Sequence, residues 1–438
     1  MRKWLINFLI VILVSVMLVT RIIDRDIFIG YNNLLILLGI VLVVISGGYF
    51  SFKLSFLQFN LFKMIRCIRK SNKRDIMALF MSLGGKIGIG SIAGVGLAIY
   101  LCGPGVLLWI WLFNLVSSIL TYCENYLGLK YKNKHGGGVF YYLSQGVSNR
   151  WLAIIYTLIL IFVYAVGFVG IQSNTVILSV EYIYNINTFI VCFLMVFIIF
   201  IIIFNKLSFI TKIMSWMVPF MCILYLGMGI VILLRFDVSF LDIFKLVIQE
   251  GLNIRNVFPA VIIVGMQRGM FASESGIGTA SIVSSISNNK ASNQALFQVI
   301  GVHFISFVIV TITGFIVIGS GYREVNSVNG IELVIDIFYK YFGSLGALLL
   351  LVIIFLFATS TIIGGYYYTI KGISFLRKGI IKSEVFLVKL FIVLLVLLGG
   401  LVNSTVIWGL LDSLIIFLLF INIYALIYLR EEIKLDDL

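Results

Sequence analysis

Ionisable side chains stand inside long apolar stretches of this sequence, where a charge is costly and is usually paired or hydrated. Five residues share this setting: Lys86, Glu124, Arg268, Glu274 and Asp412. Such residues mark the path of an ion or solute by default. For Glu124 and Asp412, neutralisation of a basic neighbour is the preferred interpretation. No catalytic dyad, nucleophile motif or metal-ligand cluster occurs in the apolar stretches, so the predicted chemistry is binding and an enzyme ranks last.

Glycines give a second kind of binding group, the exposed backbone. Residues 83–98 read LGGKIGIGSIAGVGLA and contain six glycines. Glycine weakens a helix, so this cluster indicates a broken membrane helix whose backbone lines a cavity. A continuous helix with closely packed neighbours explains the stretch alone equally well. Residues 265–280, GMQRGMFASESGIGTA, repeat the pattern. Paired interruptions in two halves of a chain favour broken helices at a transporter's binding site.

Composition places the whole chain in a lipid bilayer. Hydrophobic residues make up 61% of the sequence, charged residues 11%, and the mean hydropathy is +1.15. A soluble domain would have about 25% charged residues. The net charge of +14 comes from basic residues in short loops, which argues against nucleic acid as a partner. Five scattered cysteines imply neither a metal nor a disulfide framework, and the lack of a phosphate-binding loop leaves a gradient as the energy source.

The distribution of basic residues predicts the topology. The connection between residues 51 and 75 is the most basic one and is expected in the cytoplasm. The first apolar run follows Arg2 and Lys3 and is predicted to be an uncleaved helix. Both termini are then cytoplasmic, and about twelve spanning helices are predicted at 4–19, 34–50, 77–101, 105–128, 152–180, 187–204, 213–234, 257–284, 294–319, 343–370, 384–401 and 405–429.

The two interrupted stretches are the first and sixth of the ten spans that follow the basic connection. They begin on opposite sides of the membrane, as an inverted five-plus-five repeat requires. This predicts three regions: residues 1–75 with the N-terminal helices and the basic cytoplasmic loop, 76–235 as the first repeat, and 236–438 as the second repeat with a cytoplasmic C-terminus.

Several motifs resemble the alanine or glycine:cation symporter family in their order and spacing, over about residues 35–430. They are GKIGIGSIAGVGLAI, CGPGVLLWIW with Glu124 and LGLKYK, GGGVFYYLSQG, QSN at 172–174, RGMFASESGIG, TSTIIGGYYY at 359–368, and Trp408 with Asp412 and Asn422. The resemblance implies an all-α, leucine-transporter-like fold with broken first and sixth core helices. It also implies a secondary active symporter in the cell membrane that imports a small neutral amino acid of the alanine or glycine class with sodium.

The candidate substrate site follows from the needs of a zwitterion. Half-helix N-termini offer N–H groups to a carboxylate, while unwound carbonyls and hydroxyls suit a sodium ion. The resemblance also places Gln172 at the substrate, although an interhelical hydrogen bond is the alternative role for this amide. The substrate-binding candidates are Gly88, Ile89, Gly90, Ser91, Gln172, Gly269, Met270, Phe271 and Gly365.

The cation-binding candidates are Lys86, Ser360 and Thr361. The resemblance places the hydroxyl pair between the first and eighth core helices, and hydroxyl oxygens are ligands that a hard cation accepts. Sodium is the expected coupling ion, and no other cofactor or metal is expected. Lys86 supplies a fixed or titratable positive charge near the break, so proton coupling and uncoupled exchange stay alternatives.

Four motifs depart from the family pattern. Ile89 and Ser91 stand in GIGS where the family has GTGN, Ser273 lies in ASESG where it has SNEAG, and Gly138 completes GGG where it has GGP. Gly365 replaces a tryptophan, which predicts an enlarged pocket for a substrate such as glutamine. These departures leave open a transport-silent paralogue that acts as a sensor or scaffold.

Overall fold

The computed structural model describes residues 25–184, 186–253, 260–321, 330–399 and 404–435. The first predicted span, residues 4–19, lies outside these ranges. Within them the chain is helical, and its helices are α2 Arg25–Lys53, α3 Leu61–Lys70, α4 Lys73–Lys86, α5 Ala93–Cys102, α6 Val106–Lys130, α7 Val139–Tyr141, α8 Arg150–Ile161, α9 Val169–Tyr184, α10 Thr188–Ile203, α11 Leu207–Leu234, α12 Phe240–Leu252, α13 Ala260–Ser273, α14 Thr279–Ser284, α15 Ala291–Phe304, α16 Val310–Gly319, α17 Gly330–Arg377, α18 Lys382–Gly399 and α19 Ser404–Tyr428. The π-helical turns 162–168 and 305–309 join α8 to α9 and α15 to α16.

Seven helical stretches among the described residues are long and apolar enough to cross a membrane, and a bent pair gives an eighth. About 20 apolar residues are needed for one crossing. The chain is therefore a multi-pass membrane protein. The predicted spans at 187–204 and 257–284 correspond to α10, which is short, and to α13 with α14, which are interrupted. The count of twelve spans stays a prediction.

Helix α17 contains a sharp bend at Gly343, where φ is 64° and ψ is −152°. This backbone conformation is open to glycine, which lacks a Cβ. The bend separates a short helix that ends before Gly343 from the long apolar helix that follows. The second part agrees with the span predicted at 343–370, and it carries the hydroxyl pair of the candidate cation site.

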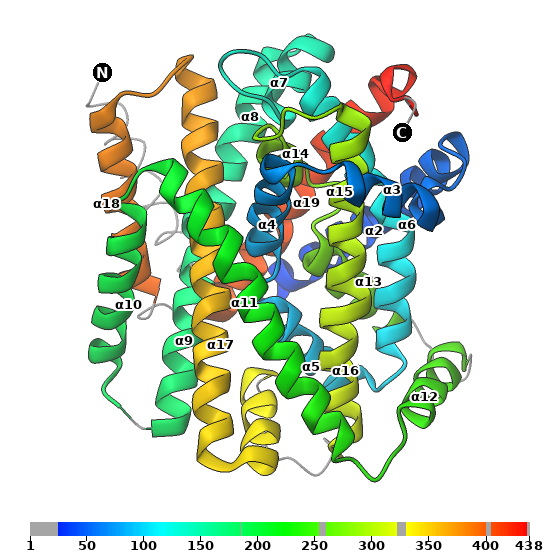
Figure 1. Cartoon of the computed structure of the whole chain (residues 1–438), viewed down its shortest axis with the longest axis vertical. Coiled ribbons are helices and arrows are strands. Elements are labelled where there is room, and N and C mark those ends of the chain that lie inside the picture. Colours follow the sequence, from blue (N-terminus) through cyan, green and yellow to red (C-terminus); the bar gives the residue numbers. More distant parts are fainter. Residues whose placement is uncertain (1–24, 185, 254–259, 322–329, 400–403, 436–438) are drawn as a thin grey trace.

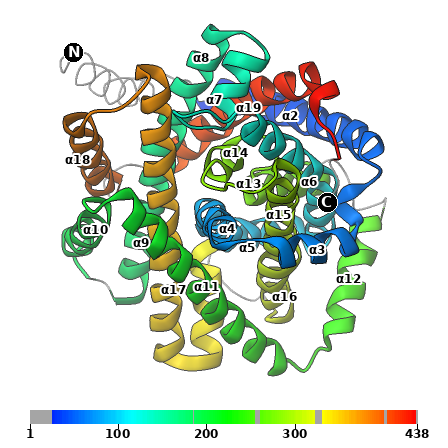
Figure 2. The ribbon, with the colours of Figure 1, turned by 45° about the horizontal axis from the view of Figure 1, so that its top comes forward.

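The interrupted helices meet in the middle of the molecule (Figure 1). Helix α4 packs on α14, and α5 packs on α13, so the two interrupted pairs run in opposite directions. In the second view, α4 and α5 lie near the centre, while α10 and α18 lie at the periphery (Figure 2). The segments that the sequence singles out are thus surrounded by the other helices.

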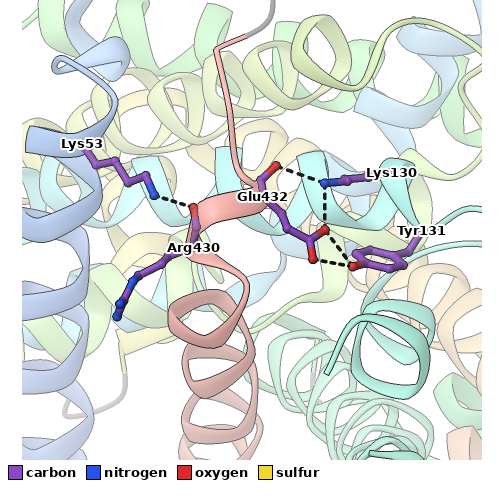
Figure 3. A network of polar contacts seen from close by, with 5 residues as sticks. All are labelled: Lys53, Lys130, Tyr131, Arg430 and Glu432. Atoms are coloured by element: carbon purple, nitrogen blue, oxygen red, sulfur yellow. Dashed lines mark hydrogen bonds and ion pairs between the residues drawn. The ribbon is translucent and has the colours of Figure 1, made fainter. Parts of the chain in front are cut away.

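Polar contacts join the C-terminal turn Arg430–Glu432 to the ends of α2 and α6 (Figure 3). The Lys53 ammonium donates to the Arg430 carbonyl at 2.6 Å. The Glu432 carboxylate lies 2.7 Å from Lys130 Nζ and accepts from the Tyr131 hydroxyl at 2.7 Å. Burial together with the Glu432 contact raises the pKa of Tyr131 to about 12.

Replacing Glu432 with glutamine is expected to destabilise the protein by about 0.5–1 kcal/mol at neutral pH, since this ion pair is partly exposed. Burial acts to raise the pKa of Glu432, but Lys130 and Tyr131 outweigh it and hold the pKa below its ordinary value of 4.5. A depressed pKa contributes stability above the unfolded value that is lost as pH falls through the folded value. Thermal unfolding in detergent should show a difference that disappears well below pH 4.5. A difference that persists at the lowest pH would contradict this account.

Candidate functional site

The first interruption lies between α4 and α5. The last α-helical bond of α4 runs from the Ile87 N–H to the Leu83 carbonyl at 2.6 Å. Gly88 is extended, with φ −102° and ψ −173°, and a short 3₁₀ turn follows. The helix axis bends by 69° across this break. The prediction of a broken helix in the stretch 83–98 is confirmed.

The second interruption lies between α13 and α14. Glu274, Gly276 and Gly278 have φ values of 49°, 85° and 103°. The backbone of Glu274 is strained, because a residue other than glycine rarely adopts a positive φ. Backbone strain of this kind is found at functional sites. The Glu274 carboxylate accepts a hydrogen bond of 2.9 Å from the hydroxyl of Thr279, the first residue of α14.

Side chains from other helices satisfy the backbone freed by the second interruption. The Tyr156 hydroxyl donates to the Ile277 carbonyl at 2.5 Å, and the Asn422 amide donates to the Gly276 carbonyl at 2.7 Å. The same Asn422 amide donates to Glu124 at 3.2 Å. Non-helical backbone at membrane depth needs such partners. These contacts fix the break in place, and they hold Glu124 beside it.

Gln172 lies directly beside the first interruption. Its side chain is 2% exposed, and its amide oxygen accepts from the Ile89 N–H at 3.4 Å. A Cβ added at Gly88 would come within 2.7 Å of the Gln172 amide nitrogen and 2.9 Å of the Thr361 hydroxyl. Gly88 is therefore flanked by an amide from α9 and a hydroxyl from α17, and the approach requires glycine.

The hydroxyl pair of α17 packs against α4. Thr361 donates to the Gly84 carbonyl at 3.4 Å and to the Phe357 carbonyl at 3.1 Å. Ser360 is fully buried, and its hydroxyl donates to Phe357 at 2.9 Å. A Cβ at Gly84 would lie 3.4 Å from the Ser360 Cβ. The structure thus brings both predicted residues against the end of α4, where their hydroxyls donate to backbone carbonyls.

Lys86 is buried at the end of α4, within electrostatic range of the Glu124 and Glu274 carboxylates, and no ion pair among the described residues includes it. The Glu124 carboxylate lies next to the second interruption, because the Asn422 amide joins it to the Gly276 carbonyl. Neutralisation of these carboxylates by the lysine stays a prediction. The three residues lie beside both interruptions, since Lys86 ends the first half-helix and Glu274 follows α13.

Apart from Gly365, the remaining candidate substrate-binding residues lie either in the first interruption or in α13. Ile89 and Ser91 are buried in the 3₁₀ turn, and an added Cβ at Gly90 would meet no atom within 4 Å. Gly269 instead faces α6, because its Cβ would lie 3.1 Å from Phe113 and 3.2 Å from the Ile110 carbonyl. Its neighbours in α13, Met270 and Phe271, are fully and partly buried respectively.

The family model for the sodium:alanine symporter family matches residues 20–436, nearly the whole chain. The chain belongs to this family. Its members are symporters, so the protein is a membrane transporter and not an enzyme, and the family resemblance of the motifs is confirmed.

Individual members of the family are similar along most of their length. The probable sodium/glutamine symporter GlnT of Bacillus subtilis is 28% identical over 417 residues, which cover 90% of this chain and 86% of that protein. The amino-acid carrier protein AlsT of the same organism is 27% identical, with coverages of 87% and 83%. The sodium/alanine symporter AgcS of Methanococcus maripaludis is 26% identical, with coverages of 86% and 88%.

Solved structures support the fold at a coarser level. Two variants of the Eremococcus coleocola manganese transporter superpose with a TM-score of 0.55 at 11% and 12% identity. The match covers 81% of this chain and 76% of the transporter. At this identity the likeness concerns the fold alone.

Gly365 lies in a helix contact in this member of the sodium:alanine symporter family. A Cβ there would come within 2.6 Å of the Tyr164 backbone carbonyl. The expectation that Gly365 leaves the space of an indole open to a larger substrate therefore finds no support, because no side chain fits between α17 and the turn 162–168. Sequence could not reveal this, since it does not give the rotation of α17 about its axis.

Replacing Gly365 with alanine is expected to lower the yield of folded protein rather than to change substrate preference. Overpacking of a tight contact typically costs about 1–3 kcal/mol, and a backbone carbonyl cannot rotate away as a side chain can. Fluorescence-detected size-exclusion chromatography measures the yield. Gly227, where an added Cβ meets no atom within 4 Å, gives the matched control Gly227→Ala. Equal yields for the two variants would contradict the expectation.

Proposed function

We propose that this protein is a secondary active symporter that imports a small neutral amino acid together with sodium by alternating access. The observation that carries the proposal is the meeting of Gln172 and Thr361 on Gly88 at the first interruption. An amide that both donates and accepts and an unwound backbone can bind the two charged ends of an amino acid. The family of symporters to which the chain belongs supports the same activity.

The substrate we propose is alanine, glycine or a larger neutral amino acid such as glutamine. The names of the relatives support this range, because one is a sodium/alanine symporter and another a probable sodium/glutamine symporter. The packing of Gly365 removes one argument for the larger substrate. Ile89 and Ser91 at the first interruption do not favour one of these amino acids over another, so uptake measurements decide between them.

Sodium is the proposed coupling ion, with Ser360 and Thr361 as its hydroxyl ligands. Their position beside the Gly84 carbonyl supports this assignment. Proton coupling is the second candidate, and a specific observation favours it: Lys86, Glu124 and Glu274 are buried ionisable residues beside the two interruptions. Buried ionisable groups in membrane proteins serve as proton relays in many transporters.

We propose that the two interrupted pairs belong to an inverted five-plus-five repeat in a cell-membrane protein with both termini in the cytoplasm. The opposite directions of α4–α5 and α13–α14 support the repeat. The basic residues near α3, the α6–α7 connection and the end of α17 support the orientation. Alternating access then amounts to movement of one group of helices against the other around the interruptions.

Uptake of radiolabelled alanine, glycine and glutamine into proteoliposomes tests the proposal. An inward sodium gradient is expected to drive accumulation of at least one of the three, while a potassium gradient of equal size serves as the control. Accumulation that follows a pH gradient and ignores sodium would replace sodium with protons. A folded protein that moves none of the three under any gradient would favour the sensor or scaffold.

A further inference from the structure

A pocket lies at one end of the molecule, between the α6–α7 connection, the start of α8 and the end of α17. Its volume is about 390 Å³. Ligand sites commonly measure about 300–1,000 Å³. Because the pocket lies at a helix end, it is distinct from the interruptions in the middle of the bundle. The walls combine basic residues with an aromatic group, in which Phe375 lies edge-on to Tyr141 at a centroid distance of 5.4 Å.

The charge of this pocket is positive. Arg150, Lys378 and His135 line it, and all three are exposed. No carboxylate lines the pocket in the part of the chain that the structure describes. The sequence shows why, since it has no aspartate or glutamate at 125–180 or at 337–383, the two segments that build the walls. A ligand of this pocket should therefore carry negative charge.

The carboxylate nearest to Lys378 in the sequence is already engaged elsewhere. Glu384 forms an ion pair with Arg377 at 2.7 Å, and its second oxygen accepts from the Ile381 N–H at 3.2 Å. Across the described ranges, neither Arg150 nor Lys378 takes part in an ion pair. The chain thus neutralises Arg377 and leaves its neighbour Lys378 open to an external anion.

The position of Arg150 connects the pocket with the lipid surface. Arg150 is the first residue of the apolar stretch Arg150–Tyr184, which is long enough to span the membrane. The next residue, Trp151, is 76% exposed, and Ile155 one turn later is 47% exposed. Tryptophan at the end of a spanning helix marks the level of the lipid headgroups. The pocket therefore lies where phosphate groups of the bilayer are concentrated.

We propose that this pocket binds the phosphate-bearing headgroup of an anionic phospholipid, with Arg150 and Lys378 as the charged partners of the phosphate. Gln145 and Tyr141 supply uncharged donors for headgroup hydroxyls, and Phe375 supplies an apolar wall for the glycerol backbone. Basic pockets between membrane helices bind acidic lipid headgroups in this way. The site shares no residue with the transport site, so it extends the proposed function.

Native mass spectrometry of the full chain in a neutral detergent tests the proposal with added phosphatidylglycerol, phosphatidylcholine or inorganic phosphate. Wild type is expected to retain phosphatidylglycerol in preference to phosphatidylcholine. The variant Arg150→Gln/Lys378→Gln should bind phosphatidylglycerol roughly 30-fold more weakly, since each basic residue near an acidic lipid contributes about fivefold. The charge-keeping variant Arg150→Lys/Lys378→Arg should bind like wild type, which separates loss of charge from loss of folding.

A matched control removes the same charge at another place. Arg69 and Lys70 are exposed in the last turn of α3 and do not line the pocket. The variant Arg69→Gln/Lys70→Gln should retain phosphatidylglycerol as wild type does. Equal loss in both double variants would reduce the effect to diffuse charge and overturn the proposal, as would equal retention in all proteins. Displacement of the lipid by inorganic phosphate at a similar concentration would make this a site for soluble anions and overturn the lipid assignment.

Discussion

Gln172→Leu is expected to weaken amino-acid uptake by an order of magnitude or more while leaving the protein folded. The leucine side chain fills a similar volume but offers neither a donor nor an acceptor. The Ile89 N–H would lose its partner at the interruption, and a bound amino acid would lose a hydrogen bond to a charged group. Such a bond contributes about 1.5–3 kcal/mol, which corresponds to roughly 10- to 150-fold in apparent affinity. Initial uptake rates over a range of substrate concentrations measure the loss.

A second buried glutamine gives the control for this variant. Gln294 in α15 is 1% exposed, and neither polar atom of its amide has a hydrogen-bond partner among the described residues. Gln294→Leu makes the same chemical change away from the interruption and should retain transport. If Gln172→Leu transports with unchanged apparent affinity, Gln172 only joins α9 to the interruption, and the substrate assignment fails.

The interruptions could be predicted from sequence because their cause is local. Clustered glycines remove helix propensity at that point of the chain, whatever surrounds them. The structure confirms both breaks and places Gln172 at the first one. The partners of the freed carbonyls could not be predicted, since Tyr156 and Asn422 lie far away in sequence. A hydroxyl or amide inside an apolar helix is the signal that could have suggested them.

Side-chain direction explains the prediction that the structure does not support. Gly365 stands four residues after Thr361 in α17, so the two residues lie on roughly the same face of the helix. Yet the structure directs Gly365 at the Tyr164 carbonyl and Thr361 at Gly88. A family motif gives the residue type at a position but not the local packing. The hydroxyl pair at positions 360 and 361 reaches the interruption because α17 packs along both α4 and α5.

Replacing both Ser360 and Thr361 with alanine is expected to raise the sodium concentration for half-maximal uptake by tenfold or more. The two hydroxyls lie beside Gly84, and a cation held there would have to exchange hydration water for these oxygens and nearby carbonyls. A contact of hydrogen-bond strength contributes about 1 kcal/mol. The loss of two ligands therefore corresponds to a roughly 30-fold higher sodium concentration for half-maximal uptake. Uptake measured against sodium concentration at constant ionic strength gives the shift.

Two further variants decide whether this shift comes from ligation. Thr361→Ser keeps the hydroxyl and should leave the sodium dependence near that of wild type. Thr359→Ala removes the hydroxyl of the adjacent residue in α17, and this hydroxyl has no hydrogen-bond partner in the described structure. This variant should also transport normally. If the double alanine variant keeps the wild-type sodium dependence, the hydroxyls serve only to pack α17 against α4. Sodium would then be bound by other groups at the interruption, such as the backbone carbonyls freed there.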